Sequence, residues 1–352
     1  MNLTPEDKSP EHSRLSTLLW AIAPVIAALL FTMLILLAVG APPVRAIAVI
    51  LQGAVESPQK WADVATAWAP LALVGAGMSL TFAAGLWNIG AEGQIILGAI
   101  FATWVARNVA LPQAPLLALI VLAGLLGGAL WGLLTGALKV YARVHEIFAG
   151  LGLNFVATAL VIWLIFNPWK PARGATMSGT EPFPKAAWVP RLGQTRLPPL
   201  AVALAIIAVV IAYLLLKGTR FGLALRAIGK NHRAAYLQGI PTNRHTLIAF
   251  VLCGAMAGLA GALQATAVYH RLIPRISGGM GYTGMLVVLL AGYRPEWAPA
   301  VAIFFAAIGV GSPRLELTMQ LDAALGGVLE GAVVLFMLLG AGLRKRLERE
   351  QG

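Results

Sequence analysis

The chain has 352 residues, of which 59% are hydrophobic and 11% are charged, and its mean hydropathy is +0.80. A soluble domain carries about 25% charged residues, so this composition excludes a water-soluble globular protein. The formal net charge of +12 does not indicate nucleic-acid binding, because the basic residues lie in short segments between apolar stretches and form no nucleic-acid motif. Basic loops of this kind orient a membrane protein in its bilayer.

Residues 1–17 are polar and mixed in charge, and they predict a cytoplasmic tail. They do not predict a cleaved secretion signal, because the next apolar run, Leu18–Val39, is long enough to stay as a spanning helix of about 20 residues. Further full-length apolar runs follow in chain order: Ala67–Ala84, Ile89–Val105, Leu116–Leu138, Ile147–Phe166, Pro199–Leu216 and Leu247–Val268. Two short runs, Thr283–Ala291 and Ala298–Val310, precede a last full-length one, Ala323–Gly342.

These runs predict an all-α polytopic helical bundle over residues 18–342 with about ten spans. Eight spans plus a re-entrant hairpin, formed by the two short runs, is the alternative. Ten spans put both termini, including the tail 343–352, in the cytoplasm. They also put the Pro- and Gly-rich segment 167–198 outside the cell and the basic segment 217–245 inside. The second placement agrees with the tendency of loops rich in Lys and Arg to stay in the cytoplasm.

Glycine is abundant, with 38 residues, and it recurs at four-residue spacing. Gly124, Gly128, Gly132 and Gly136 lie on one face of one run, and the pairs Gly254/Gly258 and Gly327/Gly331 repeat the spacing. Small residues let helix backbones approach closely in lipid, where apolar burial contributes little. The pattern favours packing inside the bundle over a seam between two protomers.

Two stretches resemble others later in the chain. Val74–Met78 resembles Cys253–Ala257, and the Gly-rich junction Gly85–Gly93 has a counterpart in Ser277–Gly284. On the ten-span count the two halves enter the membrane from opposite sides. An inverted repeat of that kind places the substrate path between the halves, near broken helices.

The segment Gly85–Gln94 holds Asn88, Glu92 and Gln94 between two apolar runs. If it is helical, Asn88 and Glu92 share a face one turn apart, although its three glycines predict a broken or kinked helix. Polar groups at membrane depth face a cavity or each other. Two interpretations stay open: a solute-path or gating element, and a polar hinge that satisfies its own backbone carbonyls.

The segment 218–240 is basic and amphipathic, and it lies between two spans. A helix resting on anionic lipid has this character. Its small residues, such as Gly229 and Ala235, instead favour close docking onto a partner protein, and chemistry alone leaves both readings open.

Three further polar residues, Glu146, Asn154 and Glu330, lie within or at the ends of apolar runs. Glu146, in Val144–Ile147, is typical of the first turn of a helix. Asn154 and Glu330 are further candidates for the translocation path, because polar groups within spans are functional by default, with snorkelling as the alternative for Glu330.

Several kinds of chemistry have no supporting residues. The five histidines show no metal-ligand spacing, and the lone cysteine, Cys253, predicts a buried inert thiol. No G-x-x-x-x-G-K-[ST] phosphate loop occurs, and no soluble stretch is long enough for a nucleotide-binding domain. The chain therefore predicts no enzyme and no cofactor of its own; if ATP drives transport, ATP and Mg²⁺ bind a separate chain.

Together, the segments Gly85–Gln94, Val144–Asn154, Phe221–Gly239 and Gly254–Leu263 resemble the bacterial nucleoside permeases of ATP-binding cassette (ABC) transporters. Those permeases belong to a larger group that handles simple sugars and branched-chain amino acids. The resemblance runs from about Ala67 to Leu339. It implies a multi-pass subunit of the bacterial inner membrane that imports a small polar solute, a nucleoside before a simple sugar.

The resemblance also implies roles and partners. Phe221–Ile240 would be the coupling segment that docks on the ABC ATP-binding subunit, and Asn88, Glu92 and Gln94 fall on the signature near the path. A second homologous permease, forming a heterodimer, and an extracytoplasmic solute-binding lipoprotein of the basic membrane protein type complete the system. The coupling residues are Arg220, Phe221, Gly222, Arg226, Gly229, Ala235 and Gly239.

Two rival functions remain. A secondary carrier would use Glu92 and Glu330 as ionisable sites, and its uptake would survive ATP depletion but not loss of the ion gradient. An intramembrane enzyme would need a nucleophile–base pair or a metal cluster on facing helices, and the sequence shows neither.

Overall fold

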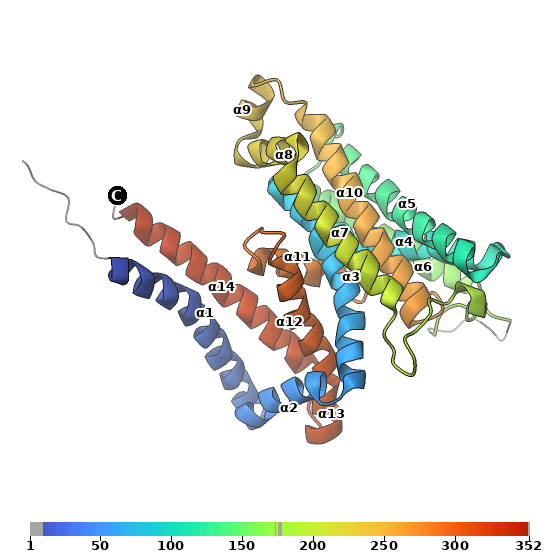
Figure 1. The fold of residues 1–352 in the computed structure, drawn as a ribbon, viewed down its shortest axis with the longest axis horizontal. Coiled ribbons are helices and arrows are strands. Elements are labelled where there is room, and N and C mark those ends of the chain that lie inside the picture. Colours follow the sequence, from blue (N-terminus) through green and yellow to red (C-terminus); the bar gives the residue numbers. More distant parts are fainter. Residues whose placement is uncertain (1–9, 173, 175–177, 351–352) are drawn as a thin grey trace, which may run out of the picture. The chain divides into compact units, whose positions relative to one another are not determined.

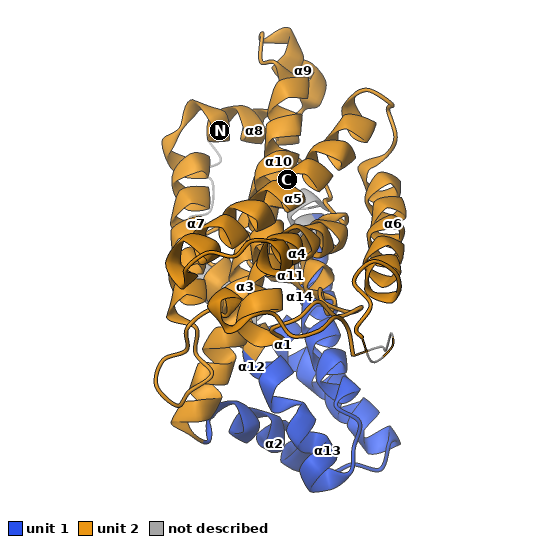
Figure 2. Cartoon of the chain, turned by 90° about the vertical axis from the view of Figure 1, so that its right-hand side faces the viewer, with its two compact units in different colours: residues 1–56, 307–352 blue, residues 57–306 orange. Residues whose placement is uncertain are grey.

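The computed structural model describes residues 10–172, 174 and 178–350, and within these ranges the regular structure is entirely helical (Figure 1). The chain divides into two compact units. Unit 1 comprises residues 1–56 and 307–352, and unit 2 comprises residues 57–306 (Figure 2). The predicted all-α helical bundle is confirmed.

Unit 2 contains most of the predicted runs. Its helices are α3 (Pro58–Ala83), α4 (Ala91–Asn108), α5 (Gln113–Val140), α6 (Glu146–Phe166), α7 (Pro199–Gly218), α8 (Arg220–Lys230), α9 (His232–Leu237), α10 (Thr242–Leu263), α11 (Met280–Leu290) and the start of α12 (Ala298–Gly311). A π-helical turn, Gln264–Val268, extends α10.

The helices of unit 2 form an inner and an outer set. In α3 and α10, 72% of the most apolar 18-residue window is buried, against 28% in α6 and α7. Helix α4 is buried along most of its length and packs against α5 and α10. Because the outer helices present apolar side chains outward, polar groups within the spans must point into the bundle to avoid exposure to lipid.

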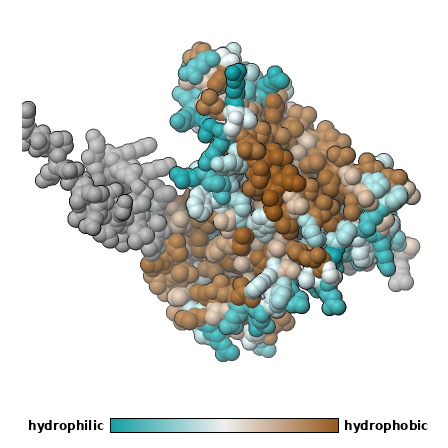
Figure 3. Space-filling model, viewed as in Figure 1, coloured by the Kyte–Doolittle hydropathy of each residue, from teal (hydrophilic) through white to brown (hydrophobic). Residues whose placement is uncertain are grey.

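Hydrophilic residues are concentrated near the ends of the helices of unit 2. Figure 3 shows hydrophilic residues gathered around α8 and α9 and at the opposite end of unit 2, with a hydrophobic band between. Among the described residues, six helices are long and apolar enough to cross a membrane, or up to seven if the bent pair Ala23–Ala38 and Pro43–Val55 counts as one span. This supports a multi-pass membrane protein, while the count of ten or eight spans stays a prediction.

The glycine stripe of α5 packs within the bundle, as predicted. A Cβ on Gly128 would lie 2.6 Å from the Cα of Gly258, and a Cβ on Gly132 would be 3.0 Å from the carbonyl carbon of Phe250. The stripe thus faces α10, and backbones meet where no side chain intervenes. Gly327 and Gly331 have no such neighbour within 4 Å, so the third glycine pair marks no close approach within the described residues.

Unit 1 contains α1 (Pro10–Ala38), α2 (Pro43–Val55), α13 (Pro313–Met319) and α14 (Ala324–Glu350). The rings of Phe31 and Phe336 are 5.6 Å apart, and a Cβ on Gly340 would touch Pro24, so α1 and α14 run antiparallel. Residues 10–17 and 343–350 of the two predicted tails are helical, while residues 1–9 and 351–352 lie outside the described part of the chain.

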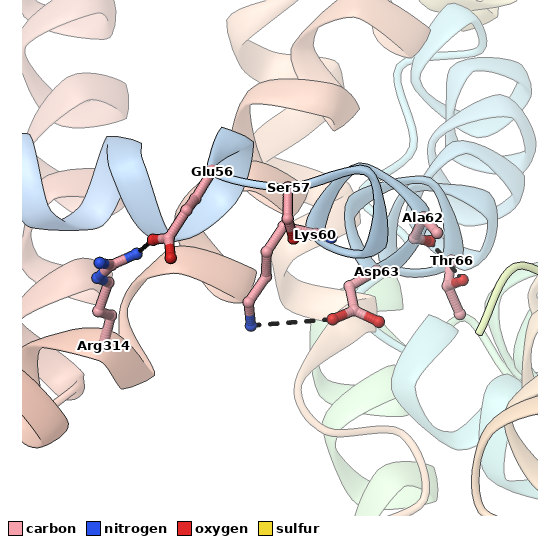
Figure 4. Close-up of polar contacts among 7 residues, drawn as sticks. All are labelled: Glu56, Ser57, Lys60, Ala62, Asp63, Thr66 and Arg314. Carbon is pink, nitrogen blue, oxygen red and sulfur yellow. Dashed lines mark hydrogen bonds and ion pairs between the residues drawn. The ribbon is translucent and has the colours of Figure 1, made fainter. Parts of the chain in front are cut away.

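Helix α2 and the first part of α3 were not predicted from the sequence. Helix α2 has 13 residues, too few for a span, and its end is joined to α13 by an ion pair between Glu56 and Arg314 (Figure 4). In unit 2, the Ser57 hydroxyl caps α3 by accepting a hydrogen bond from the Lys60 amide at 3.3 Å, and a 3.9 Å ion pair joins Lys60 to Asp63 (Figure 4). This cap lets α3 begin nine residues before the predicted run.

Candidate functional site: a polar break joined to the α8–α9 segment

The segment Gly85–Gln94 breaks the path of the chain between α3 and α4, as its glycines predict. Helix α3 ends at Ala83, Gly85 adopts a left-handed φ of +72°, and α4 begins at Ala91. The segment is therefore not one continuous helix, so the condition under which Asn88 would share a helical face with Glu92 is not met. Asn88 lies in the turn before α4, because the backbone reverses at Gly85 and never continues as one helix.

Asn88 pairs with Gln94 inside the bundle. The Asn88 Nδ2 donates to Gln94 Oε1 at 3.1 Å, and Gln94 Nε2 donates back to Asn88 Oδ1 at 3.2 Å. The same Asn88 nitrogen lies 3.0 Å from the Cys253 Sγ of α10. All three side chains are buried, so the predicted buried thiol is confirmed, and it also accepts a hydrogen bond that the sequence did not predict. This pairing holds the turn against α10.

Glu92 joins α4 to the beginning of α11. Its Oε1 accepts the Gly279 amide at 2.9 Å, and its Oε2 accepts the Gly281 amide at 2.7 Å. A carboxylate at a helix N-terminus satisfies unpaired amides and is stabilised by the helix dipole. Gly279 needs its left-handed φ of +82°, and a Cβ on Gly281 would lie 2.5 Å from the Glu92 amide nitrogen. Both glycines thus let the carboxylate reach the backbone.

Asn154 ties α6 to the same break. Its Oδ1 accepts the Gly93 amide at 2.8 Å, and its Nδ2 donates to the Ile89 carbonyl at 3.0 Å and lies 3.4 Å from the Tyr282 hydroxyl of α11. A buried side chain that satisfies backbone groups on both sides of a break stabilises the broken conformation. Asn154 therefore connects α6 to the turn before α4, to the first turn of α4 and to α11.

The structure brings four of the five predicted path residues into one polar network: Asn88, Glu92, Gln94 and Asn154. Glu330 belongs to α14 in unit 1 and is not part of it. Within the network the side chains hydrogen-bond to one another and to freed backbone groups, which is the geometry of a polar hinge. Contact between any of the five residues and a transported solute stays a prediction.

In each of the two pairs of similar stretches, the two members contact each other in the fold. Glu92 contacts the Ser277–Gly284 stretch directly, and a Cβ on Gly77 would lie 3.0 Å from the Cα of Cys253. Gly279, Gly281 and Tyr282 are site residues that were not predicted from the sequence. The resemblance of Gly85–Gly93 to Ser277–Gly284 was the signal that could have identified them.

The segment after α7 folds as two short helices whose ends are set by their sequence. Thr219 caps α8 by accepting the Gly222 amide at 3.2 Å, and Asn231 caps α9 by accepting the Ala234 amide at 3.0 Å. Gly222 packs against the carbonyls of Leu215 and Leu216, and Gly239 ends α9 with a φ of +82°. The local backbone structure therefore explains why glycine occupies two of the predicted coupling positions, Gly222 and Gly239.

The α8–α9 segment has a buried face and an exposed face. Leu225, Ile228 and Ala235 are buried, and the Phe221 ring stacks on His245 at 5.5 Å. The exposed face carries Arg220 and Arg226 together with three large apolar side chains: Leu223 is 63% exposed, Tyr236 67% and Leu237 76%. Large apolar side chains exposed beyond the end of a span are characteristic of a surface that another molecule covers.

Helix α8 approaches the polar break most closely where two glycines meet. A Cβ on Gly85 would lie 3.3 Å from the Cα of Gly229, and a Cβ on Gly229 would lie 3.0 Å from the Gly85 nitrogen and would collide with the Ala83 carbonyl. No side chain separates the two glycines, so a displacement of α8 acts directly on the turn that carries Asn88.

The start of α6 has the helix-terminus geometry that the sequence favours. The His145 Nδ1 accepts the Ile147 amide at 3.4 Å, and Glu146 in the first turn forms a 2.6 Å ion pair with Lys139. Glu146 is therefore explained by helix capping and charge pairing.

At the opposite end of α10, the described part of the segment 167–198 packs on residues 266–272. The Phe183 amide donates to the His270 carbonyl at 2.8 Å, and the Trp188 ring stacks on the His270 ring at 4.0 Å. The His270 Nδ1 lies 2.8 Å from the Thr266 carbonyl, and its Nε2 lies 2.6 Å from Arg191 Nη2. Burial and the Arg191 charge hold the pKa of His270 below its usual value, against the opposing effect of Thr266.

Comparison with known proteins identifies the family. The family model described as "Branched-chain amino acid transport system / permease component" matches residues 61–338. The chain belongs to this permease family. Relatives include a glucose ABC transporter permease protein of Haloferax volcanii, 33% identical over 89% of this chain and 85% of the relative. A guanosine ABC transporter permease protein of Bacillus subtilis is 24% identical over 78% of the permease and 80% of the relative, and a nucleoside ABC transporter permease protein of Lactococcus lactis is 24% identical over 83% and 82%.

The relatives occur in pairs. A second guanosine permease protein of Bacillus subtilis is 29% identical to this permease, and a second nucleoside permease protein of Lactococcus lactis is 28% identical. Each of these two organisms therefore has two permease proteins that are related to this chain.

Proposed function

We propose that this chain is the permease subunit of an ABC importer and that it forms the translocation path for a nucleoside. The observation that carries the proposal is the backbone contact between Gly229 and Gly85, which joins an exposed segment outside the spans to the broken helices inside. Force applied to α8–α9 thereby reaches Asn88, and through Glu92 it reaches α11. The network positions the broken helices along the path.

A separate ABC ATP-binding subunit supplies the force, and α8–α9 is the segment that docks on it. The exposed apolar side chains Leu223, Tyr236 and Leu237 support this docking, because a groove on a partner would bury them. ATP and Mg²⁺ bind that subunit, the α8–α9 end faces the cytoplasm of a bacterial cell, and hydrolysis occurs outside this chain. A second, homologous permease completes the membrane-embedded pair.

Replacing Arg226 tests the docking role. Arg226 is exposed on α8, and Arg226→Glu reverses its charge without altering the buried face. Uptake by the complete importer is expected to be lost, while solute capture by the extracytoplasmic lipoprotein stays intact. Lys185→Glu, at an exposed position in the segment 167–198, is the matched control and retains uptake. Normal uptake by Arg226→Glu contradicts the docking role.

The solute assignment rests on the relatives named for guanosine and nucleosides and on one aromatic side chain. Tyr282 is 42% exposed, and its hydroxyl is joined to the polar network through Asn154. We place the nucleobase against this ring, because base–aromatic stacking contributes about 1–3 kcal/mol per base. Tyr282→Ala should therefore raise the KM for nucleoside uptake by about tenfold or more, whereas Tyr282→Phe and the control Tyr269→Ala should change it little.

A simple sugar is the second candidate, because the glucose permease relative is 33% identical to this chain. Uptake of labelled guanosine and labelled glucose by the same complete importer separates the two. Guanosine uptake that excess glucose does not inhibit supports the nucleoside. Glucose uptake without guanosine uptake replaces the nucleoside by the sugar and leaves the ABC mechanism in place.

A further inference from the structure

A groove in unit 2 lies where two spans end, beside the contact of α8 with the polar break. Its volume is about 560 Å³, and its walls come from the ends of α3 and α7, from α8 and from the connection between α11 and α12. Phe82 and Tyr293, whose rings are 5.5 Å apart, form an aromatic side of the groove.

The groove gathers positive charge from three separate segments. Lys217, Arg226, Lys230 and Arg294 line it, against the single carboxylate of Glu296, which leaves a net charge of +3. Glu296 forms a 2.8 Å ion pair with Lys217. Across residues 10–172, 174 and 178–350, no carboxylate lies within ion-pair distance of the other three cations, and Glu296 attracts Arg294 only at longer range. Three like charges around one hollow repel each other unless an anion enters it.

The position of the groove favours a lipid as the source of the anion. Val210 and Leu214 are 48% and 55% exposed on α7, and Lys217 follows on the same helix face. An acyl chain lying along Val210 and Leu214 would bring its headgroup to Lys217 and into the groove. Basic pockets between spans at the membrane surface bind anionic headgroups in this manner.

We propose that this groove binds the phosphate of an anionic phospholipid such as phosphatidylglycerol. The headgroup phosphate lies among Lys230, Arg294 and Lys217, with Tyr293 at the interface, where aromatic rings are favoured. The bound lipid stands against Gly229 and so supports α8 on the polar break. This inference depends on the membrane embedding of the chain and not on the identity of the solute.

Lipid binding to the purified full-length chain in detergent tests the proposal, with phosphatidylglycerol and phosphatidylcholine offered separately. The variant Lys230→Gln with Arg294→Gln removes two of the unpaired cations. Its affinity for phosphatidylglycerol should fall by about 25-fold, because each basic side chain near an anionic lipid contributes about fivefold. Lys170→Gln with Lys185→Gln, at exposed positions of the segment 167–198, is the matched control and should keep the wild-type affinity.

A second variant guards against misfolding. Lys230→Arg with Arg294→Lys keeps both charges and should retain binding of phosphatidylglycerol. Equal binding of the two lipids by the wild-type chain, or an equal loss in the control pair, overturns the proposal. It is also overturned if inorganic phosphate binds the groove more tightly than phosphatidylglycerol does, or if the neutralised variant binds the lipid normally but no longer binds the ATP-binding subunit.

Discussion

Gly229 of α8 lies directly against Gly85 in the turn before α4, and a Cβ on Gly85 would be 3.3 Å from the Gly229 Cα. This contact joins an exposed segment to the turn that carries part of the buried polar network. A rigid coupling element must touch the element that it moves, and here it does so without an intervening side chain that could adjust. On the proposed coupling role, a displacement of α8 would therefore displace the turn that carries Asn88.

Gly229→Ala should uncouple transport from ATP hydrolysis. The added Cβ would collide with the Ala83 carbonyl, so α8 must move away from the turn. We expect uptake by the complete importer to fall at least tenfold while the ATPase activity of the assembled complex persists. Gly218→Ala is the matched control, because a Cβ at Gly218 meets no atom within 4 Å. Wild-type coupling in Gly229→Ala would show that the contact transmits nothing.

Glu92→Gln should destabilise the protein. The substitution removes the negative charge that accepts the Gly279 and Gly281 amides, and the amide nitrogen of glutamine cannot replace a carboxylate oxygen as an acceptor. Hydrogen bonds to a charged group contribute about 1.5–3 kcal/mol, so we expect a loss of that order in the free energy of unfolding, measured by thermal unfolding in detergent. Asp63→Asn disrupts only the 3.9 Å surface pair with Lys60 and should cost less than about 1 kcal/mol. Equal losses in both variants would contradict the role of Glu92.

Some features of the fold and of the polar network could be predicted from the sequence, and others could not. The glycines of α5 and α10 were predictable, because four-residue spacing places them on one helix face. The break at Gly85 was predictable from its three glycines. The partners of Glu92 were not predicted, because Gly279 and Gly281 lie 187 and 189 residues away along the chain and offer backbone amides rather than side chains. Only the resemblance of Gly85–Gly93 to Ser277–Gly284 pointed to the stretch that contains them. Helix α2 was missed because 13 residues fall below the length of a span.

His270 should make the stability of the segment 167–198 depend on pH. The pKa of His270 is lowered in the folded chain, so the folded state binds fewer protons at this group than the unfolded state. Its contribution is fully present above the usual histidine pKa of about 6.5 and is lost as the pH falls through the folded value. Protonation also places a second cation beside Arg191, 2.6 Å away.

Limited proteolysis of the segment 167–198 checks this expectation. Cleavage of the wild-type chain should accelerate between pH 7.5 and pH 5, relative to the cleavage of an unfolded peptide of the same sequence. His270→Gln lacks the titrating group and should show a flatter dependence. Parallel pH profiles for the two proteins would mean that His270 does not control the segment.

The docking of α8–α9 on an ATP-hydrolysing partner is tested most directly by a photo-reactive residue at Leu237, which is 76% exposed, in the assembled transporter. A second probe at Trp163, 55% exposed on the outer helix α6, reports contact with lipid or other chains. The account predicts that Leu237 cross-links to the ATP-binding subunit and that Trp163 does not. A Leu237 probe that reacts only with reagents outside the cell, or that never captures that subunit in a complex competent for uptake, would contradict it.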